Sequence, residues 1–401
     1  MFTNEILKKY AEVMIWGLGE SLKEVNGEFK KGDIIQINFD AKALSLAEII
    51  FTKLIKMGFH PIYNMLSTPI MQLWFYELAS EEQLTFMPPW AKMQTKNIKG
   101  SINLCAPASL DHLKNVDPHK IAFGAKSKKP LKDIRKKLAQ KGSYCWTLAT
   151  LPTKALADMA GLSLKDYTNE VIKACYLDMP DPIARWEETK RQSGEIIKWL
   201  QSMDIEKLHI ESDNIDLFVY PGEQRRWASG RGCNIPSFEI FTSPDCRKTH
   251  GIYYANMKSF HGGKLTEGMR LEFKKGKIID VSAEKEENFI REIFSADKGA
   301  AMLGEFSLTD RRHSRISHFM ANTLYDENTG GEYGNCHIAP GSSFTDLYTG
   351  KESLTKNLMK KIGFNDSAIH WDLVNTERKR VSAYLKNGIK KVIYIDGEFT
   401  L

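Results

Sequence analysis

The chain has 401 residues, of which 42% are hydrophobic and 26% charged, and its formal net charge is +6. This is the composition of a globular protein, and it excludes a disordered, collagen-like or disulfide-scaffold chain. A weak positive charge spread over this length does not indicate binding to nucleic acid or to a membrane surface. Because a single hydrophobic core stops growing near roughly 250–300 residues, we expect two domains.

Strands and helices alternate in the first half of the chain. We expect strands at 34–39, 60–66 and 101–106, and a helix with one apolar stripe at 46–57. Strand, helix and strand in series indicate a βαβ arrangement with a parallel or mixed sheet. Residues 1–204 are therefore expected to form an α/β domain.

Two further helices are expected to close this domain. Ser163 with Asp166 three residues later resembles a capping box for a helix that ends at Leu177. Asp181 and Pro182 are typical of an N-cap and a first helical residue, and they predict a helix to about residue 203.

A basic segment covers residues 126–141. Leu131, Ile134 and Leu138 keep a helical apolar stripe through it, which favours a solvated helix face over a phosphate-binding patch. A non-enzymatic alternative is that this segment binds an acidic partner.

Strands dominate after about Asp204. They are expected in pairs that flank short turns: 208–211 with 215–220, 269–273 with 278–281, and 381–385 with 390–395. The last pair flanks Asn387-Gly388, a strong hairpin signal. With one helix at 284–294, residues 205–401 are expected to form a mostly β domain.

The six cysteines include no CxxC pair, so neither a zinc ribbon nor a redox dithiol is indicated. Scattered single cysteines are typical of a reducing compartment. The N-terminal residues hold no apolar segment of signal-peptide length, and no run approaches about 18 apolar residues. We therefore expect a cytoplasmic protein with no membrane segment.

Two histidines are candidate metal ligands. In His370-Trp371-Asp372 an extended strand would point the imidazole and the carboxylate to the same face, where they could hold one ion. His337 lies close to Pro340 and Gly341, which indicates a loop. A structural role is the alternative for each histidine when it is taken singly.

Three glutamates are the remaining candidates. Glu239 and Glu305 each lie inside an apolar stretch, where an unpaired charge is very costly to bury. Each is therefore paired, bound to a metal, or on the wet face of an alternating strand. Glu327 precedes a glycine-rich loop, and an ordinary loop acid is the alternative for it.

Taken together, these residues offer two imidazoles and three or four carboxylates without a thiolate. This mixture suits zinc, cobalt or manganese. Because one ion needs about three or four protein ligands, the set indicates two divalent ions that share a bridging carboxylate and a water.

Four ordered segments carry a resemblance to a known family. They are NIPSFEIFTSPD (234–245), LGEFSLTD (303–310), DENTGGEYGNCHIAPGSSF (326–344) and SAIHWDL (367–373). With them the chain resembles the M29 family of metallo-aminopeptidases, most closely over residues 205–401. The resemblance implies a homodimeric exopeptidase that binds two divalent ions and releases N-terminal residues from short peptides with a free N-terminus.

The resemblance also implies roles for individual residues. The metal ligands of the family fall on Glu239, Glu305, His337, His370 and Asp372, and an acid associated with the metals falls on Glu327. We expect Glu305 to bridge the ions, and Glu305 or Glu327 to carry the water proton to the leaving amine as the catalytic residues.

One position departs from the family pattern. Phe344 stands where the family typically has a tyrosine that is thought to stabilise the tetrahedral intermediate. A phenyl ring cannot donate a hydrogen bond, and the loss of one such donor costs about 2.7–4 kcal/mol. Tyr348 is a candidate substitute. The alternatives are a weakly active homologue and a metal-dependent hydrolase of another small amide.

Overall fold

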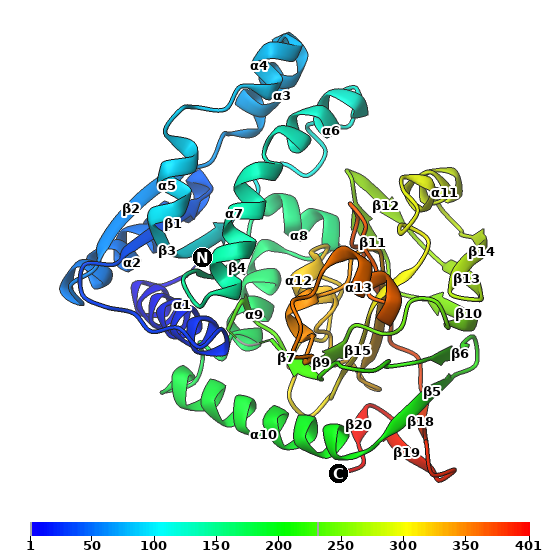
Figure 1. Ribbon diagram of the computed structural model, residues 1–401. Coiled ribbons are helices and arrows are strands. Elements are labelled where there is room, and N and C mark those ends of the chain that lie inside the picture. The colour runs from blue at the N-terminus through cyan, green and yellow to red at the C-terminus, as the bar shows by residue number, and fades with distance from the viewer. Residues whose placement is uncertain (1, 231) are drawn as a thin grey trace. The chain divides into compact units, whose positions relative to one another are not determined.

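The computed structural model describes residues 2–230 and 232–401, so Met1 and Arg231 lie outside the described residues (Figure 1). The chain forms two compact units. The first comprises Met1–Arg185 and Arg231–Pro236, and the second comprises Trp186–Gly230 and Ser237–Leu401. The division into domains 1–204 and 205–401 stays a prediction, and it differs from these units mainly by the helix after residue 181.

The first unit is built on a five-stranded parallel sheet with the order β2-β1-β3-β4-β8. Its strands are β1 (Ile34–Phe39), β2 (His60–Met65), β3 (Ile98–Cys105), β4 (Cys145–Thr150) and β8 (Asn234–Ile235). Parallel neighbours need a crossover connection, and α2 (Leu44–Lys56) supplies it between β1 and β2. The predicted α/β arrangement with a parallel sheet is confirmed.

The first unit also contains the helices α1 (Asn4–Glu24), α3 (Pro69–Leu78), α4 (Glu81–Thr85), α5 (Ala91–Asn97), α6 (Pro118–Ser127), α7 (Lys129–Gln140), α8 (Lys154–Ala160) and α9 (Leu164–Ala174), with a 3-10 turn η1 (Ala41–Ala43). The predicted stripe of α2 is buried at Leu46, Ile50 and Leu54. Ser163 caps α9 as predicted, since its hydroxyl accepts a hydrogen bond from the Asp166 amide. None of the described helices has the length and apolar character needed to cross a membrane.

The second unit contains an eight-stranded antiparallel sheet with the order β14-β13-β10-β6-β5-β18-β19-β20. Its strands are β5 (Ile205–Glu211), β6 (Asp216–Val219), β10 (His250–Ala255), β13 (Met269–Lys274), β14 (Lys277–Ser282), β18 (Arg380–Leu385), β19 (Lys390–Ile395) and β20 (Glu398–Phe399). All three predicted strand pairs are antiparallel neighbours in this sheet.

A second antiparallel sheet in this unit has the order β17-β16-β15-β9-β7. Its strands are β7 (Ala228–Ser229), β9 (Glu239–Thr242), β15 (Leu303–Thr309), β16 (Asn335–Pro340) and β17 (Leu373–Asn375). The unit is completed by β11 (Ser259–His261), β12 (Lys264–Thr266), α11 (Glu287–Ser295), α12 (Thr323–Asp326), α13 (Lys356–Ile362), a 3-10 turn η2 (Thr345–Leu347) and, from Trp186 on, α10 (Pro182–Ser202). The predicted mostly β region is confirmed.

One hydrophobic core holds the two sheets of the second unit together. It contains Leu208 and Val381 from the larger sheet and Ile240, Phe306 and Ile338 from the smaller one. Successive side chains of a strand point to opposite faces, so the neighbours of the last three residues point to the other face of the smaller sheet. That second face carries the polar residues described below.

Tyr253 of β10 ties the larger sheet to the strands of the smaller one. Its hydroxyl lies 2.9 Å from the carbonyl oxygen of Cys336 and 2.7 Å from that of Leu373, and it donates to them. Cys336 belongs to β16 and Leu373 begins β17. One buried hydroxyl therefore holds two neighbouring strands.

We expect Tyr253→Phe to lower the free energy of unfolding by about 1–3 kcal/mol, because two buried carbonyl oxygens lose a donor. Urea unfolding monitored by circular dichroism measures this change. The matched control is Tyr254→Phe, which alters the adjacent, half-buried tyrosine on the opposite face of β10. Equal stability of the two variants would contradict this role of Tyr253.

Candidate metal centre

Three adjacent strands supply the first group of candidate ligands. Glu239 begins β9, Glu305 lies in β15, and His337 lies in β16. All three alternate with core residues, so their side chains share the face of the sheet that points away from the core. That face is not exposed to solvent at these positions, because the exposed fractions of Glu239, Glu305 and His337 are 7%, 2% and 0%.

The loop predicted around His337 is wrong. His337 lies in the middle of β16 and is paired with Ser307 on one side and with Val374 on the other. Pro340 and Gly341 do not interrupt this pairing, because Pro340 is the last residue of the strand and Gly341 has a φ of 119° just beyond it. A proline is tolerated at such a position.

The strand predicted at His370-Trp371-Asp372 is also wrong. His370 forms only an isolated bridge with Gly341, and β17 begins at Leu373. The left-handed backbone of Gly341 interrupts the ladder at this point. The two side chains nevertheless converge, with Nε2 of His370 3.4 Å from Oδ1 of Asp372.

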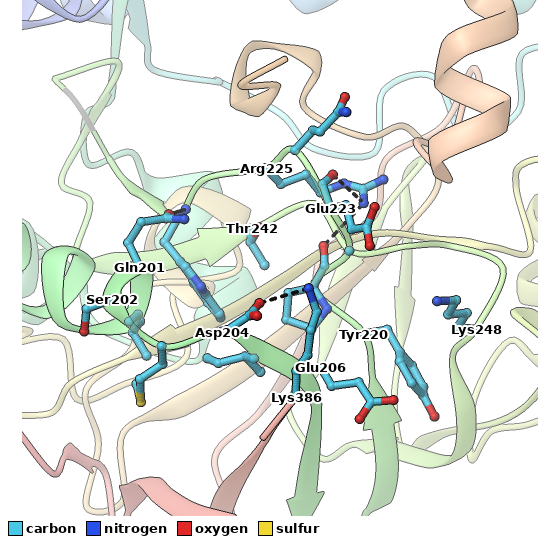
Figure 2. Close-up of a pocket in the computed structure, with 17 residues that line it drawn as sticks. Gln201, Ser202, Asp204, Glu206, Tyr220, Glu223, Arg225, Thr242, Lys248 and Lys386 are labelled. Atoms are coloured by element: carbon cyan, nitrogen blue, oxygen red, sulfur yellow. Dashed lines mark hydrogen bonds and ion pairs between the residues drawn. The ribbon is translucent and has the colours of Figure 1, made fainter. Parts of the chain in front are cut away.

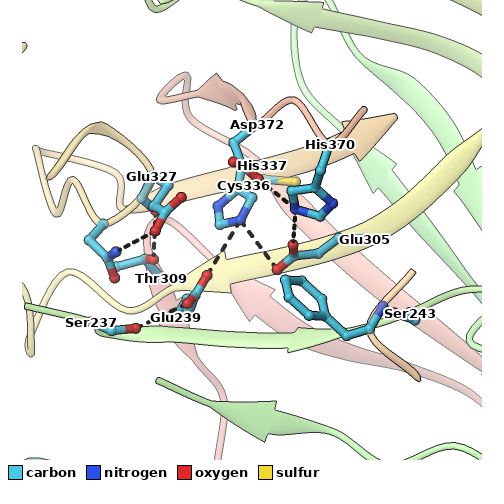
Figure 3. Close-up of polar contacts among 12 residues, drawn as sticks. Ser237, Glu239, Ser243, Glu305, Thr309, Glu327, Cys336, His337, His370 and Asp372 are labelled. Atoms are coloured by element: carbon cyan, nitrogen blue, oxygen red, sulfur yellow. Dashed lines mark hydrogen bonds and ion pairs between the residues drawn. The ribbon is translucent and has the colours of Figure 1, made fainter. Parts of the chain in front are cut away.

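These residues form two groups that share Glu305 (Figure 3). One group is Glu239, Glu305 and His337, and the other is Glu305, His370 and Asp372. Within each group the ligand atoms all lie within 4.8 Å of one another. Nε2 of His370 lies 3.1 Å from Oε2 of Glu305, while Nε2 of His337 lies 3.6 Å from Oε1 of the same carboxylate. The structure therefore brings five of the six predicted site residues into two small donor sets.

Glu327, the sixth predicted residue, lies beside these groups and belongs to neither. It follows α12 directly, is 7% exposed, and accepts a hydrogen bond of 3.4 Å from Nδ2 of Asn328. Figure 3 places it next to Glu239 and on the side of the cluster opposite Glu305. Glu327 is therefore an acid that lies beside the two donor groups and is not a member of either.

The buried acids and imidazoles shift one another's pKa. Burial, and after it the nearby Glu305 carboxylate, raise the pKa of Glu239 to about 7. Burial and neighbouring carboxylates also hold the pKa of Glu327 well above its ordinary range. Burial alone would lower the pKa of His337 and of His370, but the surrounding carboxylates outweigh it and raise both values. Without another cation, the cluster therefore retains protons.

The donor set fits divalent cations. Both ring nitrogens of the fully buried His337 lack a hydrogen-bond partner among the described residues. Its Nε2 lies 3.5 Å from Oε2 of Glu239, which is too long for a hydrogen bond but leaves room for an ion between donors. Among the described residues, Glu239, Glu305 and Asp372 form ion pairs only with the two histidines. Carboxylates in such a site are neutralised either by retained protons or by a bound cation.

Two further groups orient the candidate ligands, and the sequence did not reveal them. Nδ1 of His370 lies 2.9 Å from the carbonyl oxygen of Ser342, so this nitrogen donates and Nε2 faces the carboxylates. The Ser237 hydroxyl donates to Oε1 of Glu239 at 3.1 Å. A backbone carbonyl leaves no signal in the sequence, whereas Ser237 could have been found from its position two residues before Glu239.

Phe344 borders the cluster. Its ring is 36% exposed and lies edge-on to His370, with ring centroids 5.0 Å apart. The same ring packs against Phe241 at 5.3 Å. The ring of Tyr348 packs instead against Phe364, at 6.3 Å. Phe344 is therefore the aromatic residue that contacts a candidate ligand.

A cavity of about 430 Å³ elsewhere in the second unit is lined by none of the six predicted residues (Figure 2). Three of its charged groups are bonded within the protein. Asp204 and Lys386 form an ion pair at 3.0 Å, and Nη2 of Arg225 donates to the carbonyl oxygen of Ile362 at the end of α13. The Arg225 guanidinium also lies 4.2 Å from the ring centre of Phe364. This cavity is separate from the candidate metal centre.

Comparison with known proteins adds independent findings. A family model described as thermophilic metalloprotease (M29) matches residues 3–399. Aminopeptidase 2 of Geobacillus stearothermophilus is 24% identical over 415 residues, covering 98% of this chain and 97% of that protein. Aminopeptidase T of Thermus thermophilus is 28% identical over 274 residues, covering 64% and 65%. The solved structure of wild-type AmpT from Thermus thermophilus shares the fold, with a TM-score of 0.81, 23% identity and 99% coverage of both chains.

We expect the metal-free protein to lose stability as the pH rises from about 5 to about 7. The folded state keeps a proton on Glu239 up to a pKa of about 7, whereas the ordinary value is 4.5. In this interval the folded state binds more protons than the unfolded state, so the free energy of unfolding falls by up to about 1.4 kcal/mol per pH unit for each such proton. The raised pKa values of His337 and His370 act in the same direction.

Urea unfolding of chelator-treated protein at several pH values measures this dependence. Glu239→Gln should flatten it, while Glu352→Gln, at an exposed glutamate, should leave it unchanged. A stability that rises across this interval in the metal-free wild type would contradict the assignment.

Proposed function

The chain belongs to the M29 family of metalloproteases, and we propose that it is an aminopeptidase that releases N-terminal residues from short peptides with two divalent ions. The observation that carries the proposal is the pair of donor groups that share the buried Glu305. The names of relatives such as aminopeptidase 2 and aminopeptidase T support the peptidase activity.

Each donor group would hold one ion. Glu239 and His337 would bind one, His370 and Asp372 would bind the other, and Glu305 would bridge them. Zinc, cobalt and manganese all suit this set of oxygen and nitrogen donors. When bound, such ions act as Lewis acids that polarise a carbonyl group and make hydroxide available near neutral pH.

Groups of the chain itself would orient the metal ligands and transfer the proton. The Ser342 carbonyl holds Nδ1 of His370, which keeps Nε2 directed at the cluster. Glu327 is a buried carboxyl group that belongs to neither donor set, and we assign to it the transfer of a proton from the attacking water to the leaving amine. Glu305 is the second candidate for this transfer.

The donors of the site favour a substrate with a free N-terminus. Four carboxyl groups stand with two imidazoles: Glu239, Glu305 and Glu327 are buried, and Asp372 is half-buried. Two divalent ions would balance these four carboxylates, and the unprotonated α-amine of a peptide would offer them a further nitrogen donor. An N-acetylated peptide lacks a basic amine, and it would therefore be a poor substrate.

We also propose that the protein acts in the cytoplasm. Its six cysteines all lie in the described residues and are thiols. Unbridged cysteines are typical of proteins in a reducing compartment, which supports this location.

A second function is favoured by one specific observation. The exposed ring of Phe344 contacts His370 at the position where the resemblance expects a tyrosine hydroxyl. The protein would then hydrolyse another small amide, or cleave peptides weakly, because no hydroxyl at this position stabilises the oxyanion.

The proposed function is tested by release of amino acids from unblocked tripeptides after loading with zinc, cobalt or manganese. We expect turnover that is lost on N-acetylation of the substrate and on treatment with a chelator. Glu305→Gln should lower kcat at least about 10²-fold, because Glu305 belongs to both donor groups. The control Glu352→Gln changes an exposed glutamate and should keep full turnover. Unchanged turnover in Glu305→Gln would refute the assignment.

We expect Phe344→Tyr to raise kcat on tripeptides by about tenfold or more, within the roughly 10²–10³-fold effect of one oxyanion donor. Phe344→Leu is the matched control at the same position, since it also changes the ring but adds no hydroxyl. A rise with both substitutions would assign the effect to space rather than to a hydrogen bond. No rise with tyrosine, together with turnover of a different amide, would favour the second function.

A further inference from the structure

The backbone of Glu327 is attached to two strands of the candidate metal centre. Its carbonyl oxygen accepts hydrogen bonds from Nδ2 of Asn335 at 3.0 Å and from the hydroxyl of Thr309 at 3.4 Å (Figure 3). Thr309 ends β15, which carries Glu305, and Asn335 begins β16, which carries His337. The backbone at Glu327 is therefore fixed relative to both of these candidate ligands.

The side chain of Glu327 is held by its neighbour in the chain. Among the described residues, Asn328 is the only one that donates a hydrogen bond to the Glu327 carboxylate, from Nδ2 to Oε1 at 3.4 Å. This distance is long for a hydrogen bond, as is common for catalytic groups before substrate binds. No described residue donates to Oε2, so that oxygen remains available to exchange a proton.

The same carboxamide also reaches the strand that carries Glu239. Oδ1 of Asn328 accepts the backbone N–H of Phe238, the residue directly before Glu239, at 2.5 Å. Its Nδ2 also donates to the carbonyl oxygen of Leu324 in α12, at 3.0 Å. Asn328 is 0% exposed. One fully buried side chain thus links the carboxylate of Glu327 to α12 and to the start of β9.

Both contacts require a carboxamide. Oδ1 must accept a hydrogen bond from an amide while Nδ2 donates one to a carboxylate, and asparagine offers both from one short side chain. An aspartate at position 328 would have no donor in its ionised form. It would also add a carboxylate beside Glu327, where the nearby Glu239 already raises the pKa after the larger effect of burial.

We propose that Asn328 is a positioning residue that sets the direction of the Glu327 carboxylate relative to β9. The inference rests on the proposed function, in which Glu327 transfers the proton, and it names a residue on which that transfer depends. Asn328 acts through Glu327. If Asn328 only stabilised the segment after α12, its substitution would lower stability and leave kcat unchanged.

Asn328→Asp keeps the acceptor for Phe238 and removes the donor to Glu327. We expect kcat on unblocked tripeptides to fall at least about tenfold, with KM within about twofold, because a misplaced group can cost up to about 10²-fold in rate. The metal content should not change. Asn328→Ser removes the carboxamide without adding a charge, and it should show the same loss. In a Glu327→Gln background, Asn328→Asp should lower kcat no further, because the two residues act as one unit.

The matched control is Asn375→Asp. Asn375 is also 0% exposed, and its Nδ2 likewise donates to a backbone carbonyl, that of Tyr254 at 2.8 Å, and to a glutamate, Oε2 of Glu377 at 3.2 Å. It is paired with Cys336, a residue of the hydrophobic core, so its side chain shares the core face of the sheet. Asn375→Asp should lower the urea midpoint and keep the kcat of the wild type.

The position of Glu327 can also be measured without turnover. In crystals of the metal-loaded Asn328→Asp variant we expect the Glu327 carboxylate to move by about 1 Å or more, while Glu239 and Glu305 stay in place. Full kcat in Asn328→Asp or Asn328→Ser, a further loss in the Glu327→Gln background, or an unmoved carboxylate would each overturn the inference and leave the proposed function standing. A wild type that binds metal but releases no amino acid would refute the proposed function, while a displaced carboxylate would still support the role of Asn328.

Discussion

The burial of carboxylates together on one face of a sheet is the constraint on which the second unit depends. Glu239, Glu305 and Asp372 are surrounded by protein, and among the described residues they are paired only with His337 and His370. Such a cluster is unfavourable unless protons or cations neutralise it. The raised pKa values of both histidines and of Glu239 indicate that protons fill this role when no metal is bound.

The architecture of the unit resolves this conflict between burial and charge. The smaller sheet packs its apolar face, with Phe306 and Ile338, against the larger sheet, and this contact supplies the hydrophobic stabilisation. Alternation along the same strands then places Glu305 and His337 on the opposite face. The hydroxyl of Tyr253 holds β16 and β17 from the core side, so hydrogen bonds as well as apolar packing fix the strands beneath the cluster.

Much of the fold was predictable because it is encoded locally. The hairpin at 381–395 follows from Asn387-Gly388, and α2 follows from the spacing of its apolar residues. The sequence allowed the candidate residues of the site to be named, but it did not predict the secondary structure that positions them. His337 was assigned to a loop because Pro340 and Gly341 are strong local signals, while its pairing on both sides is made by residues distant in the sequence. Alternation around Glu305 was visible in the sequence, but only the tertiary packing shows that both faces of β15 are buried.

The most direct test of the metal centre is anomalous diffraction at the zinc or cobalt edge from crystals of the metal-loaded protein. We expect two peaks, one between Glu239, Glu305 and His337 and the other between Glu305, His370 and Asp372. A fully loaded crystal with no peak at this face of the sheet, or with its only peaks elsewhere, would contradict the account.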